Sequence, residues 1–428
     1  MTNLVLIDCH DLGRHLGTYG RTTVPSPNLD ALAADGIRFD NSFCTAPQCS
    51  PSRAGLYTGR YPHATGMLGL AHQPFGWRLN AGEIYLARYL LDAGYTTVQV
   101  GMQHVTDRTP EAVQQLGFQE VRPAHHAGEV ADAAIDWLRG APDGPFFLNI
   151  GFTEPHRDEN GLFKQAAPDT RLGVDVPPYL PQTAEARAEF AELQGVIGLM
   201  DEAVGRIRGA LAELGLLDDT LLIFTTDHGL AMPRAKTTLY DPGIETALIM
   251  YGPPFGLTGG RTFDTLISNV DLVPTILDML DLTVPANIQG RSFADLLRGN
   301  TYRPREYIYA GKTFHTDYEP QRAVRSQRYK LIWNAEVDII NVAGDIMHSP
   351  IYPQMIEQLT VERPPLELYD LESDPLEQHN RIDDVDYMLV AAELRHHLLN
   401  WMQQTGDPIL NGPIASPYYA RALKLLRE

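Results

Sequence analysis

Short apolar runs alternate with longer amphipathic stretches along roughly the first 300 residues of the chain. The short runs are β-rich and read as strands at 3–7, 95–101, 145–152, 220–226 and 246–252. The amphipathic stretches read as helices at 26–36, 82–94, about 184–214 and 270–280. Strands that are apolar on both faces and separated by helices are typical of a largely parallel sheet between helix layers. The pattern predicts an α/β domain over residues 1–300.

The alternation of predicted strands and helices ends at about residue 300. Segments 305–311, 322–334 and 365–371 look like antiparallel strands, and 387–404 looks like a final helix. We therefore predict a smaller α+β domain over residues 301–428, with an antiparallel sheet, packed on the first domain.

Composition narrows the classes of function. The chain has 428 residues, 44% of them hydrophobic, and a formal net charge of −20, which disfavours a nucleic-acid partner. An anionic substrate would need a local cluster of cations. We find no signal peptide, no membrane-spanning run and only three cysteines, so the expectation is a protein of the reducing cytoplasm with no membrane partner.

Polar residues gather where two predicted strands end. Asp8, His10 and Asp11 follow the first strand, and Asp227 and His228 follow the strand at 220–226. In an open α/β sheet, ligands bind outside the carboxyl ends of the strands. Carboxylates and imidazoles there predict a divalent cation site of the Ca²⁺ or Mn²⁺ kind. The competing interpretation is that Asp11 and Asp227 only cap helices.

The stretch "CSPSRAGLYTGR" begins at Cys49. Ser50 is a candidate N-cap and Pro51 suits the first helical position, so Cys49 lies where free N–H groups favour an anion. With Arg53 one turn later, Cys49 could be a thiolate nucleophile of low pKa. The alternative is a buried, inert thiol.

This stretch resembles the signature of the type I sulfatases, in the alkaline phosphatase superfamily, through the residues Cys49, Ser50, Pro51, Ser52, Arg53, Leu56, Thr58, Gly59 and Arg60. The resemblance implies an alkaline-phosphatase-like fold and oxidation of the cysteine to formylglycine by a generating enzyme. The hydrated aldehyde would then be the nucleophile. Segments such as "GMLGLAHQ" and "LELYDLESDPLEQHN" resemble the sulfamidase branch of the family, and the likeness covers nearly the whole chain.

Carried over position by position, the resemblance implies metal ligands at Asp11, Asp227 and His228, with the modified Cys49 facing the ion. It also implies residues around the anion: Arg53 at the formylglycine hydroxyl, His104 and His156 at the sulfate or leaving group, and Lys236 on the far side.

Three positions depart from the family pattern. His10 stands where a second aspartate is usual, so either His10 ligates the metal or Asp8 substitutes. Ca²⁺ is the first expectation, and an imidazole ligand would shift preference towards Mn²⁺ or Zn²⁺. His228 in place of asparagine resembles the phosphonate monoester hydrolase and phosphodiesterase branch. Met102 replaces a common lysine, which removes a cation near the anion.

Three interpretations remain. The first is a sulfatase acting on a sulfate ester or sulfamate of a small sulfated sugar or alcohol. The others are a phosphonate monoester hydrolase or phosphodiesterase, and a non-catalytic binder of sulfated glycans. Specificity is expected from the loops at 157–183 and 335–363. His63 and His72 are expected to hydrogen-bond loops, and a homo-oligomer is left open.

Overall fold

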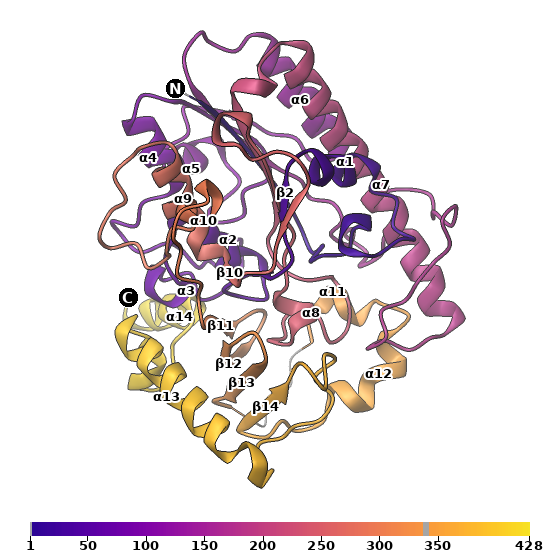
Figure 1. Cartoon of the computed structure of the whole chain (residues 1–428). Helices are drawn as coiled ribbons and strands as arrows, with labels where there is room; N and C mark the ends of the chain where they lie inside the picture. The colour runs from indigo at the N-terminus through magenta and orange to yellow at the C-terminus, as the bar shows by residue number, and fades with distance from the viewer. Residues whose placement is uncertain (1, 337–341) are drawn as a thin grey trace.

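The computed structural model describes residues 2–336 and 342–428. Its main sheet has eight strands in the order β5-β4-β6-β1-β7-β8-β2-β9 (Figure 1). The strands are β1 (Asn3–Cys9), β2 (Ile37–Phe39), β4 (Thr96–Gly101), β5 (Glu120–Arg122), β6 (Phe146–Gly151), β7 (Thr220–Thr226), β8 (Leu248–Tyr251) and β9 (Arg261–Phe263). All neighbouring pairs are parallel except those that β8 makes with β7 and β2.

Helices cover both faces of this sheet (Figure 1). One face carries α1 (Pro27–Asp35), α6 (Ala127–Arg139) and α7 (Ala184–Glu213). The other carries α2 (Cys49–Thr58), α4 (Leu86–Asp92), α9 (Leu272–Met279) and α10 (Ala294–Arg298). Alternate residues of β1 enter the two cores, Val5 and Ile7 on one side and Leu4 and Leu6 on the other. This period of two explains why the strand is apolar throughout.

A second, antiparallel sheet follows in the order β11-β12-β13-β14. Its strands are β11 (Ile308–Phe314), β12 (Tyr318–Arg325), β13 (Tyr329–Asn334) and β14 (Leu366–Asp370), and α13 (Met388–Gln404) packs on it. The remaining elements are β3 (Ser42–Phe43), β10 (Ile267–Ser268), α3 (Pro62–Thr65), α5 (Pro110–Gln114), α8 (Asp241–Ile244), α11 (Gly344–Met347), α12 (Tyr352–Leu359) and α14 (Pro417–Arg427).

The predicted fold class is confirmed: a mostly parallel sheet between helix layers, followed by an antiparallel sheet. The five predicted strands are present, whereas the three-residue strands β2, β5 and β9 are too short to show a periodic signal. The division into domains at residue 300 stays a prediction. Within the described ranges, no helix has the length and apolar character that a membrane span requires.

One local prediction is wrong. Helix α2 begins at Cys49, with Gln48 at the N-cap position, rather than after an N-cap at Ser50. The Ser50 hydroxyl instead accepts a hydrogen bond from the backbone N–H of Ala71, 3.0 Å away. The helix therefore starts two residues earlier than predicted and places Cys49 in its first turn.

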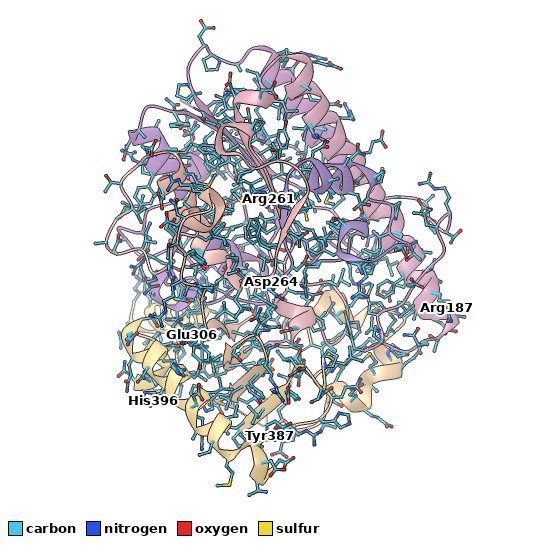
Figure 2. All side chains as sticks on the ribbon, viewed as in Figure 1. Arg187, Arg261, Asp264, Glu306, Tyr387 and His396 are labelled. Atoms are coloured by element: carbon cyan, nitrogen blue, oxygen red, sulfur yellow. The ribbon has the colours of Figure 1, made fainter. Side chains whose placement is uncertain are left out.

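Charged side chains fall into two populations. Arg187, Arg261 and Glu306 are exposed and lie on the outside of the molecule (Figure 2). Those at the ends of β1 and β7 are fully buried. Because an unpaired buried charge is very costly, the second population requires partners and marks a built polar site.

Candidate active site

The adjacent strands β1 and β7 bring two polar clusters together. Cys9 of β1 pairs with Thr226 of β7, so the residues that follow each strand emerge side by side. One carboxylate oxygen of Asp227 accepts backbone hydrogen bonds from Asp11 (3.0 Å) and His228 (2.9 Å). Neither Asp11 nor Asp227 precedes a helix, so the interpretation of these residues as helix caps is wrong.

The cluster has the chemistry of a metal site. One ligand atom each from His10, Asp11, Cys49 and Asp227 lies within 4.8 Å of the others, and all four residues are buried. His228 Nε2 lies 3.0 Å from Asp11 Oδ1 and 3.5 Å from Cys49 Sγ. Burial alone would lower the pKa of His10, but Asp227, Cys49 and Asp11 together outweigh it and raise the pKa to about 9. The carboxylates thus demand positive charge, and these donors fit a divalent cation.

His10 and Met102, two of the departures from the family pattern, contact each other. His10 Nε2 lies 3.0 Å from the Met102 sulfur, and His10 Nδ1 lies 3.2 Å from Asp227 Oδ2. A thioether is a weak acceptor, so Nε2–H can donate to it, and with a cation bound the neutral ring would offer its Nδ1 lone pair to that ion. The tautomer of a ligating histidine is set by the bond its other nitrogen makes. The contact with Met102 is therefore compatible with His10 as a candidate ligand, whereas a lysine would place a second donor against Nε2.

We expect His10 and Met102 to be energetically coupled. Met102→Lys should weaken Mn²⁺ binding, measured by calorimetry, by about 10- to 100-fold, because the ammonium opposes the cation and removes the acceptor for His10. In the double variant His10→Asp/Met102→Lys, the new carboxylate pairs with the new lysine, so the loss should be smaller than the sum of the two single losses. Met102→Leu, which keeps the volume without the charge, is the control and should lose less. Strictly additive single effects would contradict the coupling.

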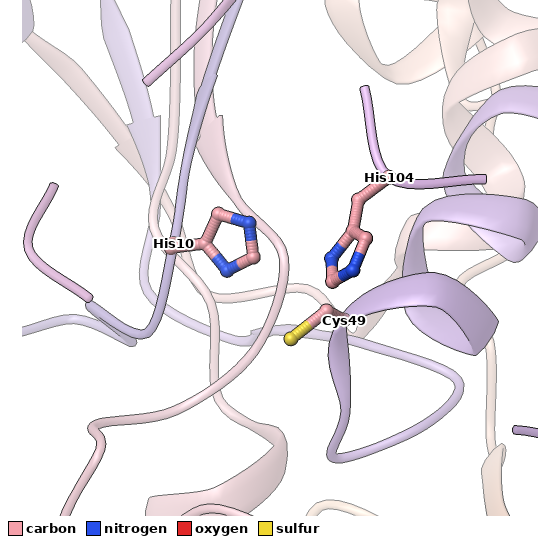
Figure 3. A group of neighbouring side chains, drawn as sticks. All are labelled: His10, Cys49 and His104. Atoms are coloured by element: carbon pink, nitrogen blue, oxygen red, sulfur yellow. The ribbon is translucent and has the colours of Figure 1, made fainter. Parts of the chain in front are cut away.

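Cys49 faces His10 and His104 across a small space (Figure 3). Burial alone would raise the pKa of Cys49, but His10 and Lys236 outweigh it and hold the pKa well below its usual value. Burial raises the pKa of Cys44, five residues earlier, whose thiol only donates to a backbone carbonyl. The surroundings of Cys49 are therefore those of a reactive sulfur and not of an inert one.

Arg53 and Asp8 form a fully buried ion pair next to the candidate ligands. The Arg53 guanidinium donates to Asp8 and, over 3.2 Å, to Asp227 Oδ2, and the Tyr57 hydroxyl donates to Asp8. Asp8 thereby accepts hydrogen bonds from Arg53 and Tyr57, and it is not part of the group of candidate metal ligands. Of the two alternatives for the missing carboxylate, the structure brings His10 into that group. Arg53 acts on Asp227 and so fixes one of the candidate ligands.

Lys236 supplies the cation on the open side. Its Nζ lies 2.8 Å from Asp11 Oδ2, 2.7 Å from Asp345 Oδ2 and 3.2 Å from His156 Nε2. Burial alone would lower the pKa of Lys236, but Asp11 and Asp345 outweigh it and raise the pKa well above its usual value. His156 Nδ1–H donates to the Arg157 carbonyl (2.6 Å), so Nε2 is the acceptor that faces the site. Lys236 and His156 therefore both lie beside Asp11, and their roles around the anion stay a prediction.

Sequence reasoning missed three side chains around this cluster. His72 Nδ1 lies 2.9 Å from His104 Nε2, and burial lowers the pKa of His104 to about 4. His72, expected only to bind a loop, therefore contacts a site residue, whereas His63 hydrogen-bonds Thr405 (2.8 Å). Asp345 and His315 come from the C-terminal part of the chain, away from the two strand ends that carried the predicted cluster. His72 lies in the segment "GMLGLAHQ", which resembles the sulfamidases, and this resemblance could have indicated a position near the site.

Comparison with known proteins decides the family. The family model described as Sulfatase matches residues 2–282, about two thirds of the chain. The chain belongs to the sulfatase family. The model described as N-sulphoglucosamine sulphohydrolase, C-terminal, matches residues 228–350 of this sulfatase. Human N-sulphoglucosamine sulphohydrolase is 28% identical over 467 residues, covering 96% of this chain and 92% of the human one.

Solved structures agree on the fold. A 2-O GAG sulfatase superimposes with a TM-score of 0.75 at 22% identity, covering 97% of this chain and 95% of the other. The phosphonate monoester hydrolase of Agrobacterium radiobacter gives a TM-score of 0.70 at 22% identity, with 95% and 96% covered. The prediction of a sulfatase, a sulfuric ester hydrolase, is confirmed by the family match and the human relative.

Proposed function

We propose that this sulfatase hydrolyses a sulfate ester or sulfamate on a small sugar, with formylglycine made from Cys49 as nucleophile and a divalent cation as cofactor. The observation that carries the proposal is the buried convergence of one nucleophilic position, one cation and the candidate metal ligands, namely Cys49, Lys236, His10, Asp11, Asp227 and His228. Similarity to human N-sulphoglucosamine sulphohydrolase supports a sulfated sugar as substrate.

The groups that the structure does not contain have defined roles. A divalent cation, when bound by His10, Asp11, Asp227 and His228, supplies a Lewis acid beside the sulfate and the nucleophile. Hydrated formylglycine supplies two hydroxyls on one carbon, one to attack sulfur and one to release sulfate without waiting for water.

Residues of the chain bind and orient the anion. The Lys236 ammonium is 2% exposed and contacts Asp11, His156 and Asp345, so it can hold a sulfate oxygen once it exchanges one of these partners. The first turn of α2 adds backbone N–H groups beside Cys49. Single donors of this kind contribute on the order of 2.7–4 kcal/mol to transition-state stabilisation in water-excluded sites. Together they replace the lysine that Met102 removes.

Two histidines are placed to move protons. His156 Nδ1 is bound to the Arg157 carbonyl, and Nε2 lies 3.2 Å from the Lys236 ammonium, so a proton that Lys236 passes to Nε2 is placed to reach the leaving oxygen or nitrogen. His104 Nδ1 has no hydrogen-bond partner among the described residues, while its Nε2 is bound to His72. It is therefore placed to take a proton at Cys49.

A phosphonate monoester hydrolase is the second candidate. It is favoured by His228, which stands where sulfatases carry asparagine, and by the fold shared with the hydrolase of Agrobacterium radiobacter. Both candidates use the same nucleophile, so only the substrate separates them.

A substrate panel on matured protein tests the proposal. The protein is produced together with a formylglycine-generating enzyme, and we expect the tryptic peptide 39–53 to carry an aldehyde at Cys49 and a free thiol at Cys44, its internal control. We then expect kcat/KM for N-sulfoglucosamine or glucosamine 6-sulfate to exceed that for a phosphodiester by about 100-fold, since the pocket must discriminate through polar contacts.

Two results would overturn the proposal. Preferred turnover of the phosphodiester would assign the chain to the second candidate. Full turnover by protein in which Cys49 remains an unmodified thiol would refute the formylglycine mechanism.

A further inference from the structure

The C-terminal part of the chain contributes two side chains to the open side of the site. Asp345 belongs to α11, and its Oδ2 lies 2.7 Å from Lys236 Nζ and 3.9 Å from His156 Nε2. Its side chain is 17% exposed, whereas that of Lys236 is 2% exposed. Asp345 therefore lies between Lys236 and solvent, where the part of the substrate beyond the sulfate must pass.

A buried ionic network fixes Asp345 relative to His156. Arg157, the neighbour of His156, donates to Glu189 Oε1 (2.7 Å) and to the carbonyls of Ala231 (2.9 Å) and Gly161 (3.0 Å). Ser349, just after α11, donates to the other Glu189 oxygen over 2.7 Å. A buried ion pair whose hydrogen bonds are satisfied specifies one arrangement. The position of Asp345 is thus built into the fold.

His315, directly after β11, is near enough to Lys236, Cys49 and Asp345 for their charges to act on its ring. It is 9% exposed, and its Nδ1 has no hydrogen-bond partner within the part of the chain that the structure describes. Burial, helped by the positive charge of Lys236, lowers the pKa of His315 to about 4, so the ring is neutral. A buried ring nitrogen left without a partner is costly unless a ligand supplies one.

A carboxylate in a pocket for an anion needs an explanation. Asp345 repels a sulfate group, and its salt bridge to Lys236 uses only Oδ2. An ionised carboxylate accepts several hydrogen bonds, and among the described residues Lys236 and His156 both approach Oδ2, so Oδ1 remains available as an acceptor. An acceptor at this place favours a substrate with hydrogen-bond donors next to its sulfate.

We propose that Asp345 and His315 form a subsite for the group that carries the sulfate, and that this subsite takes a sugar with hydroxyl or amine donors beside the scissile bond. The inference rests on the proposed function and names the substrate class: sulfated sugars rather than aryl sulfates, which offer no donor there.

Asp345→Asn tests the subsite because it removes the charge and keeps the volume. We expect kcat/KM for N-sulfoglucosamine to fall about 10- to 100-fold, mainly through KM, because a hydrogen bond to a charged acceptor is lost. The fall for 4-nitrophenyl sulfate should be at least about tenfold smaller, so that the ratio between the two substrates changes. Glu357→Gln makes the same change on the exposed side of α12 and is the matched control, with no change in the ratio.

Equal losses of kcat/KM on both substrates would show that Asp345 only positions Lys236 and would overturn the proposal. An unchanged kcat/KM on both substrates would also overturn it. Asp345→Ser replaces Asp345→Asn if the latter does not fold, as judged by its thermal transition. Calorimetry of N-sulfoglucosamine binding to Cys49→Ala protein provides a readout independent of turnover. A Kd at least about tenfold higher for the Cys49→Ala/Asp345→Asn protein than for the Cys49→Ala protein supports the subsite. Absence of any hydrolysis by the wild-type protein would refute only the proposed function.

Discussion

Cys49→Ala is expected to lower kcat for sulfate hydrolysis by a factor on the order of 10⁴ to 10⁶, because it removes the nucleophile while the rest of the site remains. The side chain is small and 2% exposed, so its loss leaves Asp227, Lys236 and the sheet in place. Initial rates on a sulfated sugar, with metal bound and folding checked by circular dichroism, measure the effect.

Cys44→Ala is the matched control. Cys44 is equally buried and five residues away, yet its thiol donates to the Ala46 carbonyl (3.0 Å) and lies outside the group of candidate ligands. We expect its turnover to stay within about threefold of wild type, because the substitution leaves the site untouched. Comparable losses in the two variants would mean that Cys49 acts through packing and not as the nucleophile.

Arg53→Met should produce the largest loss of stability. Arg53, Asp8 and Asp227 are fully buried, and the guanidinium is the cation shared by the two carboxylates. Removing one partner of a buried ionic group leaves uncompensated charge, so the free energy of unfolding should fall by about 3–5 kcal/mol. Urea unfolding in the presence of a chelator isolates this effect from metal binding.

Arg88→Met provides the comparison on the surface. Arg88 pairs with Asp92, and both side chains are more than half exposed, so we expect a change within about 0.5 kcal/mol. If Arg53→Met is no more destabilising than Arg88→Met, the buried carboxylates are neutralised by protonation and Arg53 is not their essential partner.

The sheet could be predicted because its strands are continuous apolar runs, which depend only on local sequence. The convergence of His10, Asp11, Asp227 and His228 followed from one rule, that polar residues after parallel strands meet at one edge. The orientation of β8 could not be predicted, since an apolar run is compatible with either direction of pairing.

The roles of Asp8 and Asp345 could not be predicted from the sequence, for different reasons. Asp8 lies in a strand whose residues all face a core, and only three-dimensional packing shows that it faces Arg53 and Tyr57. Asp345 enters the site through contacts with Lys236 and through the bond between Ser349 and Glu189, which joins segments 160 residues apart. Long-range pairs of this kind carry no periodic signal in a single sequence.

The burial of helix α2 has a consequence for the order of events in biosynthesis. All ten of its residues, from Cys49 to Thr58, are inaccessible in the folded protein. If Cys49 is converted as proposed, the oxidising enzyme must bind the chain around the cysteine, so it would have to act before α2 packs against α9. Conversion would then compete in time with folding, and molecules that fold first would keep the thiol. Adding the converting enzyme late, to protein already folded, would leave that fraction unmatured.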